Sequence, residues 1–346
     1  QTALITGANT GLGFEVAKQL AAANASVILG CRDMRKCAAA AATLRDRFLP
    51  RGRPPEAVQT LHVDLSDLQA VAHAARKVGK LTRSLSMLIL NAGVATQFPT
   101  LLTVDGVERT YQANFLGHFL LATRLLPLLE RTGSARAPAR IVHLTSGAHR
   151  GAPPEGVPLN LDTINAPTMG AYARYGMAKL ASLALSNEMA RRQAAAAGSH
   201  RAPRVLSHAV HPGVVATEML RAPNFARMLG FGVGHLAWLI AQARNLVFAY
   251  SARTAALSVL YAAAAAPAPA PPQVELVGVP PQHERRSSRR AAATPADTGT
   301  LIVPIATRWP AHHPMADDAA FGKALWEFSD GLVRRALKRR RVAPGR

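Results

Sequence analysis

The chain has few cysteines, few acidic residues and no long apolar run. Cys31 and Cys37 are the only cysteines among its 346 residues, and they form no CxxC motif. We therefore expect a protein of a reducing compartment, with neither a disulfide framework nor a structural zinc site. No stretch of 18 or more uninterrupted apolar residues occurs, which disfavours a membrane-spanning helix.

Acidic residues are scarce relative to basic ones. Asp and Glu number 20 against 41 Lys and Arg, a net charge of +21. Most of the excess consists of isolated arginines in Ala-rich sequence, which is typical of a solvated surface. The last thirteen residues, Arg334–Arg346, are different, because they hold seven basic residues and no acidic one. No aromatic residue interleaves with this block to stack on bases, so nucleic acid is an unlikely partner.

Short apolar runs alternate with helical segments along the chain. The expected strands are 2–6, 26–30, 58–63, 86–91, 140–145, 204–210 and 299–306, and the main helices are 13–23, 67–78, 105–131, 177–192 and 321–341. Strands that are apolar throughout and separated by helices predict a parallel sheet covered on both faces. Right-handed crossovers then give a single doubly wound (Rossmann) α/β domain, with seven strands in the order 3-2-1-4-5-6-7.

A glycine-rich turn follows the first expected strand. The segment TGANTGLG spans residues 6–13 and opens a helix. Glycines in this position let the backbone approach a pyrophosphate, which binds at the helix N-terminus. The spacing is G-x3-G-x-G rather than the commoner G-x-G-x-x-G. The candidate cofactor-binding residues here are Gly7, Asn9, Thr10, Gly11, Leu12 and Gly13.

The residues after the second and third strands bear on the choice of cofactor. An acidic residue at the end of the second strand would bind the ribose 2′-hydroxyl of NAD, but Cys31 stands there and Arg32 follows. A guanidinium suits a 2′-phosphate, so the sequence favours NADP, although Asp33 lies nearby. Asp64 has two interpretations: it accepts from the adenine amino group, or it caps the next helix.

Seven motifs occur in the order expected for one family. They are TGANTGLG, Asp64, the turn Asn91-Ala92-Gly93, Asn114, Ser146, YGMAK at 175–179 and HPGVVAT at 211–217. Together they resemble the short-chain dehydrogenase/reductase family over residues 2–262 and again over 299–335. Segments such as ANFLGHFLLATRLLPLL resemble its retinol dehydrogenase-like branch. The stretch containing LNLDTIN is similar to plant and algal members, including the dehydrogenase of the chloroplast inner-envelope import machinery.

The motif YGMAK places Tyr175 and Lys179 on one helical face, because they are four residues apart. A free tyrosine has a pKa of about 10, and a nearby ammonium and the cationic nicotinamide would lower it. Tyr175 is then the general acid in carbonyl reduction and the base in the reverse direction. The resemblance implies that Lys179 also holds the nicotinamide ribose, that Ser146 binds the reacting oxygen, and that Asn114 anchors a water that relays protons.

Further cofactor contacts are expected from the two turns that follow the fourth and sixth strands. The turn Asn91-Ala92-Gly93 lines the cofactor cleft. Pro212 and Gly213 shape a loop over the nicotinamide, and the Thr217 hydroxyl binds its carboxamide. The histidines His118, His143 and His149 are interpreted as core or loop residues, and no zinc-ligand spacing occurs, so no metal site is expected.

These observations predict an enzyme that interconverts an alcohol and its aldehyde or ketone with NADP(H). Residues 1–265 would form the NADP-binding and catalytic domain, 266–298 a disordered Pro/Ala/Arg-rich insertion, 299–335 the last strand and helix, and 336–346 a basic tail. The apolar segment 225–250 suggests a lipophilic substrate but is equally compatible with ordinary packing. One alternative is an NADP-sensing interaction protein at a membrane or translocon; a weaker one is a protochlorophyllide reductase-like enzyme.

The C-terminal helix suggests a partner. Apolar positions from Trp326 to Leu337 run into KRRR at 338–341, as in helices that lie on anionic membranes or fill a calmodulin-like groove. The other interpretation is that residues 321–333 pack on the core and the remainder is a solvated end. The sequence begins at Gln1 within an apolar run, so a targeting segment is expected to be missing, and the location is an intracellular one, cytoplasmic or plastid.

Overall fold

The computed structural model describes residues 1–94, 100–198, 202–213, 215, 250–264, 301–303, 307–309 and 313–342. Its strands are β1 (Thr2–Thr6), β2 (Ser26–Cys31), β3 (Val58–His62), β4 (Met87–Leu90), β5 (Ala139–Leu144), β6 (Val205–Val210), β7 (Leu301–Val303) and β8 (Thr307–Trp309). They form one sheet in the order β3-β2-β1-β4-β5-β6-β7-β8. The first seven strands pair in parallel, which confirms the predicted doubly wound order 3-2-1-4-5-6-7.

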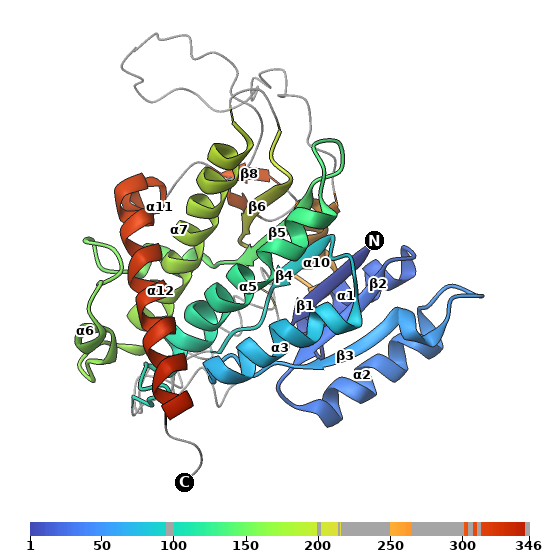
Figure 1. Cartoon of the computed structure of the whole chain (residues 1–346), viewed down its shortest axis with the longest axis horizontal. Coiled ribbons are helices and arrows are strands. Elements are labelled where there is room, and N and C mark those ends of the chain that lie inside the picture. The colour runs from blue at the N-terminus through green and yellow to red at the C-terminus, as the bar shows by residue number, and fades with distance from the viewer. Residues whose placement is uncertain are drawn as a thin grey trace.

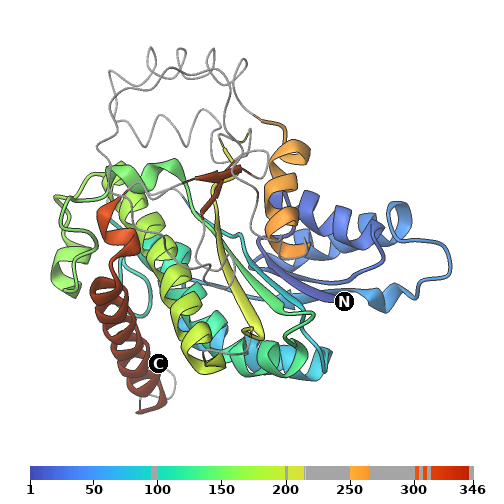
Figure 2. The same cartoon turned by 90° about the horizontal axis from the view of Figure 1, so that it is seen from above.

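Helices connect the strands and cover both faces of the sheet (Figure 1). They are α1 (Gly11–Ala22), α2 (Met34–Arg47), η1 (Pro55–Ala57), α3 (Leu68–Leu81), α4 (Arg109–Tyr111), η2 (Gln112–Leu116), α5 (Gly117–Thr132), η3 (Gly147–Gly151), α6 (Leu161–Asn165), α7 (Ala171–Ala197), α10 (Ala252–Ala264), α11 (Pro314–Asp317) and α12 (Ala319–Val342). Figure 2 shows α10 on one side of the sheet, and α7 and α12 on the other.

The alternation of side chains along each strand explains why the strands are apolar throughout. In β1, Leu4 packs in the core cluster on the side of α3, α5, α7 and α12. Its neighbours Ala3 and Ile5 pack in the cluster on the side of α1, α2 and α10. All three side chains are fully buried. A central parallel strand therefore contributes to two cores at once, and a polar residue on either face would be costly.

Three features of the fold differ from the prediction or were not predicted. Strand β8 adds an eighth, antiparallel strand at the sheet edge beside β7. The helix expected over residues 105–131 begins at Arg109 and is interrupted by a π-helical turn, η2, before α5 begins. Helices α2 and α10 were not among the helices named from the sequence, and both are rich in alanine.

The C-terminal helix α12 packs on the same core as α3, α5 and α7. Phe321, Leu325, Leu332 and Val333 are buried there, as expected for residues 321–333. The helix does not end at residue 335, however: Ala336 is also buried, and α12 continues to Val342. The boundary predicted at 336 therefore falls inside a helix that is held by packing. The expected insertion at 266–298 lies outside the described residues.

The sequence predicted no disulfide framework, and the structure has a single local disulfide that was not predicted. Cys31 at the end of β2 and Cys37 in α2 are joined in a disulfide, with their Cα atoms 6.0 Å apart. The sequence separation of six residues gave no sign of this pairing, because the turn between β2 and α2 brings the two residues together. Both side chains are buried in the core cluster beside α1.

Candidate active site

The glycine-rich turn has the geometry of an anion-binding site at the start of α1. Gly7 and Gly11 have φ of +66° and +57°, a conformation that favours glycine. A Cβ on Gly13 would lie 2.5 Å from the Gly7 carbonyl oxygen, so only glycine fits there. Thr10, the N-cap residue, makes no side-chain capping bond, and the first turn of α1 holds no acidic residue. The first N–H groups of α1 are thus left for an external anion.

Thr6 joins this turn to the turn after β4. Its Oγ1 accepts hydrogen bonds from the backbone N–H groups of Asn91 (2.9 Å) and Ala92 (3.0 Å). The Asn91 side chain donates in return to the Thr6 carbonyl, at 2.8 Å. The Asn91 amide is therefore occupied inside the protein. Ala92 and Gly93 remain as the residues whose backbone lines the cleft.

The end of β2 presents basic side chains to solvent. Arg32 follows the strand directly and is exposed. Asp33 does not compete with it, because its carboxylate caps α2 by accepting from the backbone N–H of Lys36 at 3.1 Å. That hydrogen bond lowers the pKa of Asp33. Arg35 and Lys36, which the sequence analysis did not select, are also exposed in the first turn of α2.

The structure excludes one of the two interpretations of Asp64, namely that it caps the next helix. Its Oδ1 accepts from the backbone N–H of Ser66 at 2.9 Å, within the turn after β3. The N-cap of α3 is Asp67, which accepts from Gln69 and Ala70. Asp64 is partly exposed, with a carboxylate oxygen that no described residue contacts. Its predicted role toward adenine stays a prediction.

Tyr175, Lys179 and Ser146 come together beside the turn after β4. Lys179 Nζ lies 5.5 Å from the centre of the Tyr175 ring and donates to the Leu144 carbonyl oxygen at 2.9 Å. Ser146 forms a hydrogen bond with Tyr175. A Cβ placed on Gly93 would lie 3.7 Å from Lys179 Nζ. The helix α7 and the ends of β4 and β5 therefore meet at one point.

The pKa values of these groups reflect burial more than mutual attraction. Burial lowers the pKa of Lys179 to about 8. Burial also raises the pKa of Tyr175 to about 12, opposed by the hydrogen bond with Ser146 and assisted by the charge of Tyr172. In the protein alone Lys179 donates to the Leu144 carbonyl, and the fall in the Tyr175 pKa expected with a bound cationic nicotinamide stays a prediction.

Asn114 lies in the π-helical turn η2, where its side chain forms two hydrogen bonds with the backbone of Val94. Its Nδ2 donates to the Val94 carbonyl at 2.9 Å, and its Oδ1 accepts from the Val94 N–H at 2.7 Å. The predicted role of Asn114 as the anchor of a proton-relaying water stays a prediction. Its main-chain carbonyl accepts from Ser182 Oγ at 3.4 Å and from His118 Nδ1 at 3.1 Å. The π-turn directs this carbonyl away from regular helical pairing.

His118 is a buried link that the sequence analysis assigned only to the core. Because Asn114 offers a carbonyl, His118 Nδ1 must carry the hydrogen. Its Nε2 then accepts a hydrogen bond from the Thr6 hydroxyl at 2.9 Å. The oxygen of that hydroxyl also accepts hydrogen bonds from two backbone N–H groups. Burial lowers the pKa of His118 to about 3, so the ring is neutral. Its position four residues after Asn114, on the same helical face, was the signal for this contact.

The structure describes some of the remaining predicted site residues but not all of them. Gly213, after β6, has φ of +82° and follows Pro212, consistent with a shaped loop. Thr217 lies outside the described residues, as does the apolar segment 225–250 except Tyr250. Tyr172 is half exposed on α7, and its ring closely approaches Gly151.

His143 and His149 are buried, in β5 and η3 respectively. Within the ranges that the structure describes, no three His, Cys, Asp or Glu residues lie close enough to hold a metal ion. No helix in the described part of the chain is long and apolar enough to cross a membrane.

A doubly wound sheet, a glycine-rich turn at α1 and a Tyr–Lys–Ser group beside the turn after β4 together define a class of nucleotide-dependent oxidoreductases. The family described as short chain dehydrogenase matches residues 1–158. Retinol dehydrogenase 13 of Homo sapiens is 35% identical over 248 residues, covering 71% of this chain and 69% of that protein. The chain therefore belongs to the short-chain dehydrogenase family of oxidoreductases that act on CH–OH groups, and to its retinol dehydrogenase-like branch.

Other relatives extend the similarity along the chain. The WW domain-containing oxidoreductase of Danio rerio is 30% identical over 336 residues, covering 95% of this chain and 68% of that protein. Among solved structures, an uncharacterized protein from Mycobacterium paratuberculosis is similar, with a TM-score of 0.61 and 27% identity, covering 96% of this chain and 93% of that chain. A 3-ketoacyl-(acyl-carrier-protein) reductase from Brucella melitensis has the same fold, with a TM-score of 0.55 and 19% identity; it covers 77% of this chain and 91% of that chain.

Proposed function

We propose that the protein interconverts a lipophilic alcohol and its aldehyde or ketone, with NADP(H) as the hydride carrier. The observation that carries this proposal is the meeting of Tyr175, Ser146 and Lys179 beside the Gly93 turn. The bound nicotinamide supplies the hydride chemistry. The protein supplies the cleft, the orientation of the carbonyl and the proton.

The proton chemistry belongs to Tyr175. In reduction its phenol donates a proton to the oxygen of the substrate carbonyl, and in oxidation the phenolate accepts it back. Ser146, already hydrogen-bonded to Tyr175, orients the reacting oxygen. Lys179 stabilises the phenolate by its charge once the cationic cofactor adds to the field. In the protein alone burial raises the pKa of Tyr175 to about 12, so the phenol carries the proton that reduction needs.

NADP is proposed over NAD from the charges at the end of β2. Arg32 is exposed, and Arg35 and Lys36 lie within one turn of it. Asp33, the one acid there, is turned toward α2 as its cap. A 2′-phosphate would gain charge-assisted hydrogen bonds at this place, whereas a ribose 2′-hydroxyl finds no carboxylate to accept its proton.

A lipophilic substrate is proposed from the relatives, several of which are named retinol dehydrogenases. The experiment is NADPH oxidation by the purified protein with a panel of retinoid, long-chain and short-chain aldehydes and ketones. The proposal predicts turnover with NADPH and a preference for long apolar substrates. NADP binding without turnover on any of them would favour the sensing protein instead.

For α12 we propose a calmodulin-like or membrane contact that does not involve the apolar face of the helix. The apolar residues that such a helix would insert, including Leu325, Leu332 and Val333, are buried in the core. Contact with a partner would therefore use the basic surface of α12 rather than its apolar face.

A further inference from the structure

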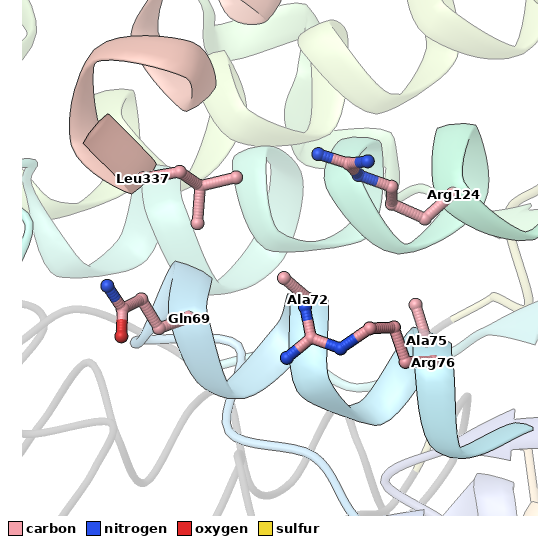
Figure 3. A pocket seen from close by; sticks show the side chains of 6 residues that line it. All are labelled: Gln69, Ala72, Ala75, Arg76, Arg124 and Leu337. Carbon is pink, nitrogen blue, oxygen red and sulfur yellow. The ribbon is translucent and has the colours of Figure 1, made fainter. Parts of the chain in front are cut away.

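A pocket of about 520 Å³ lies between α3, α5 and α12, away from the candidate active site (Figure 3). Its lining residues are Gln69, Ala72, Ala75, Arg76, Arg124 and Leu337. None of them belongs to the glycine-rich turn or to the catalytic group. Arg124 lies ten residues beyond Asn114, which is about 15 Å along a helix. The volume is within the range of small-ligand sites.

Two guanidinium groups line the pocket, and no acidic side chain lines it with them. Figure 3 shows Arg76 on α3 and Arg124 on α5, each side chain extending along its own helix on the side where Leu337 lies. Helix α3 contains no Asp or Glu, and Glu130, the one acid of α5, accepts from Gln193 at 2.9 Å. Among the described residues neither arginine has an ion pair or hydrogen bond.

The chemistry of the lining specifies the ligand. Two guanidinium groups match the oxygens of a phosphate, since each presents parallel N–H donors. The Gln69 amide adds a further donor. Ala72, Ala75 and Leu337 are apolar, so the part of the ligand next to the phosphate must be apolar too. A free inorganic phosphate would leave this half of the pocket unused.

The surface around the pocket favours a lipid bilayer as the source of such a ligand. On α12, Lys338 and Arg339 follow Leu337 directly and both are exposed, whereas Arg334, one turn before it, is paired with Asp330 at 2.8 Å. Exposed basic residues next to an anionic leaflet each add attraction. The apolar face of α12 is already buried, so binding would rest on these charges and the pocket rather than on an inserted helix.

We propose that the pocket between α3, α5 and α12 binds the phosphate head group of an anionic phospholipid. Arg76 and Arg124 hold the phosphate, and Ala72, Ala75 and Leu337 contact the adjoining glycerol and first methylenes. The site attaches the enzyme to a membrane surface, where lipophilic alcohols and carbonyls are dissolved. The binding itself does not depend on the proposed oxidoreductase activity.

The test compares two double variants of the full-length protein. R76Q/R124Q removes the two pocket arginines, and K80Q/R131Q removes two exposed charges from the same helices outside the pocket. Co-sedimentation with phosphatidylcholine vesicles, with and without phosphatidic acid, is measured at about 0.15 M salt to screen weak attraction. Soluble dihexanoyl phosphatidic acid, inorganic phosphate and polyglutamate are titrated in parallel. NADPH oxidation and thermal unfolding check that each variant is folded.

The proposal predicts binding of the wild type to phosphatidic acid vesicles and to the soluble lipid, weakened about tenfold or more in R76Q/R124Q. K80Q/R131Q should lose no more than about threefold, the share due to general charge. Equal losses in the two variants would show non-specific attraction and overturn the proposal. Inorganic phosphate or polyglutamate binding as tightly as the soluble lipid would also overturn it, in favour of a free phosphate or an acidic peptide. Absence of lipid binding by the wild type would also overturn the proposal.

Discussion

The two faces of the sheet are built from different kinds of residues. On the face of α1 and α2 the buried side chains are mainly apolar, such as Val16, Leu20 and Leu44, and the buried Glu15 is paired with Lys18 at 2.6 Å. On the face of α5 and α7, the same depth of burial holds a hydrogen-bonded polar group. Its members are Asn114, His118, Lys179 and Ser182.

The first face therefore serves mainly the stability of the fold, and the second face serves the chemistry. Apolar residues on the first face stabilise the fold in proportion to the surface they bury. Polar residues on the second face add little net stability and are costly when a partner is lost. We therefore expect substitutions on the first face to change stability and not chemistry, and substitutions on the second face to change chemistry first.

The largest effect is expected for Tyr175→Phe on the second face. Removing the phenolic hydroxyl eliminates the proton donor, so kcat should fall about 10²–10⁴-fold. NADPH affinity should be nearly unchanged, because the ring remains. Steady-state kinetics and NADPH fluorescence titration measure the two quantities. Retention of more than a few per cent of activity would show that another group donates the proton.

On the first face, Leu44→Ala should lower the free energy of unfolding by about 2–5 kcal/mol. Leu44 is fully buried in α2, and truncation leaves a cavity among apolar neighbours. The kcat per folded molecule should stay at the wild-type value. Urea unfolding and an active-site titration give the two numbers. A large fall in kcat would mean that the two faces are coupled.

Lys179→Met should stabilise the protein, whereas most substitutions destabilise it. The pKa of Lys179 is lowered by burial from 10.5 to about 8, so its charged form is disfavoured in the folded state. Below pH 8 that cost is present in full, at about 3 kcal/mol. Methionine should therefore stabilise the protein at pH 7 by up to that amount while abolishing turnover.

The pH dependence distinguishes this effect from ordinary repacking. Between pH 8 and 10.5 the wild-type lysine loses its proton on folding, so the wild type gains stability as the pH rises. The advantage of Lys179→Met should shrink over that window. Urea unfolding at pH 7 and pH 10 measures it. An advantage that is the same at both pH values would argue against charge burial.

His118→Phe tests whether the polar link supports the chemistry. The ring would still fill the space, but the Asn114 carbonyl and the Thr6 hydroxyl would each lose a partner, costing about 1–3 kcal/mol in stability. Because the glycine-rich turn and Asn114 are both held by this link, kcat should fall and KM for NADPH should rise. His118→Asn, which keeps a donor and an acceptor, should restore part of both. No difference between the two variants would make His118 a packing residue.

The smallest effect is expected at the edge of the first face, for Arg32→Ala. Losing one charge-assisted contact to a 2′-phosphate should cost about 1.5–3 kcal/mol, a roughly ten- to hundredfold fall in NADPH affinity. NADH affinity should hardly change. Binding titrations with both cofactors measure the ratio. Equal losses for both would show that Arg32 does not read the 2′-phosphate.

Much of this fold and site was readable from the chain itself. Parallel strands buried on both faces must be apolar throughout, so β1 to β6 were located within a residue or two. Glycines that need a left-handed backbone or cannot carry a Cβ, such as Gly7 and Gly13, are identifiable by residue type alone. The spacing of Tyr175 and Lys179 on a helix is likewise a local property.

What depends on distant contacts was decided only by the tertiary structure. The sequence could not show that Cys31 and Cys37 are paired or that α12 is held on the core to Ala336. It also gave no sign that Lys179 is directed at the Leu144 carbonyl or that burial raises the pKa of Tyr175 in the protein without cofactor. Burial and hydrogen-bond partners set these properties, and both come from residues far apart in the chain.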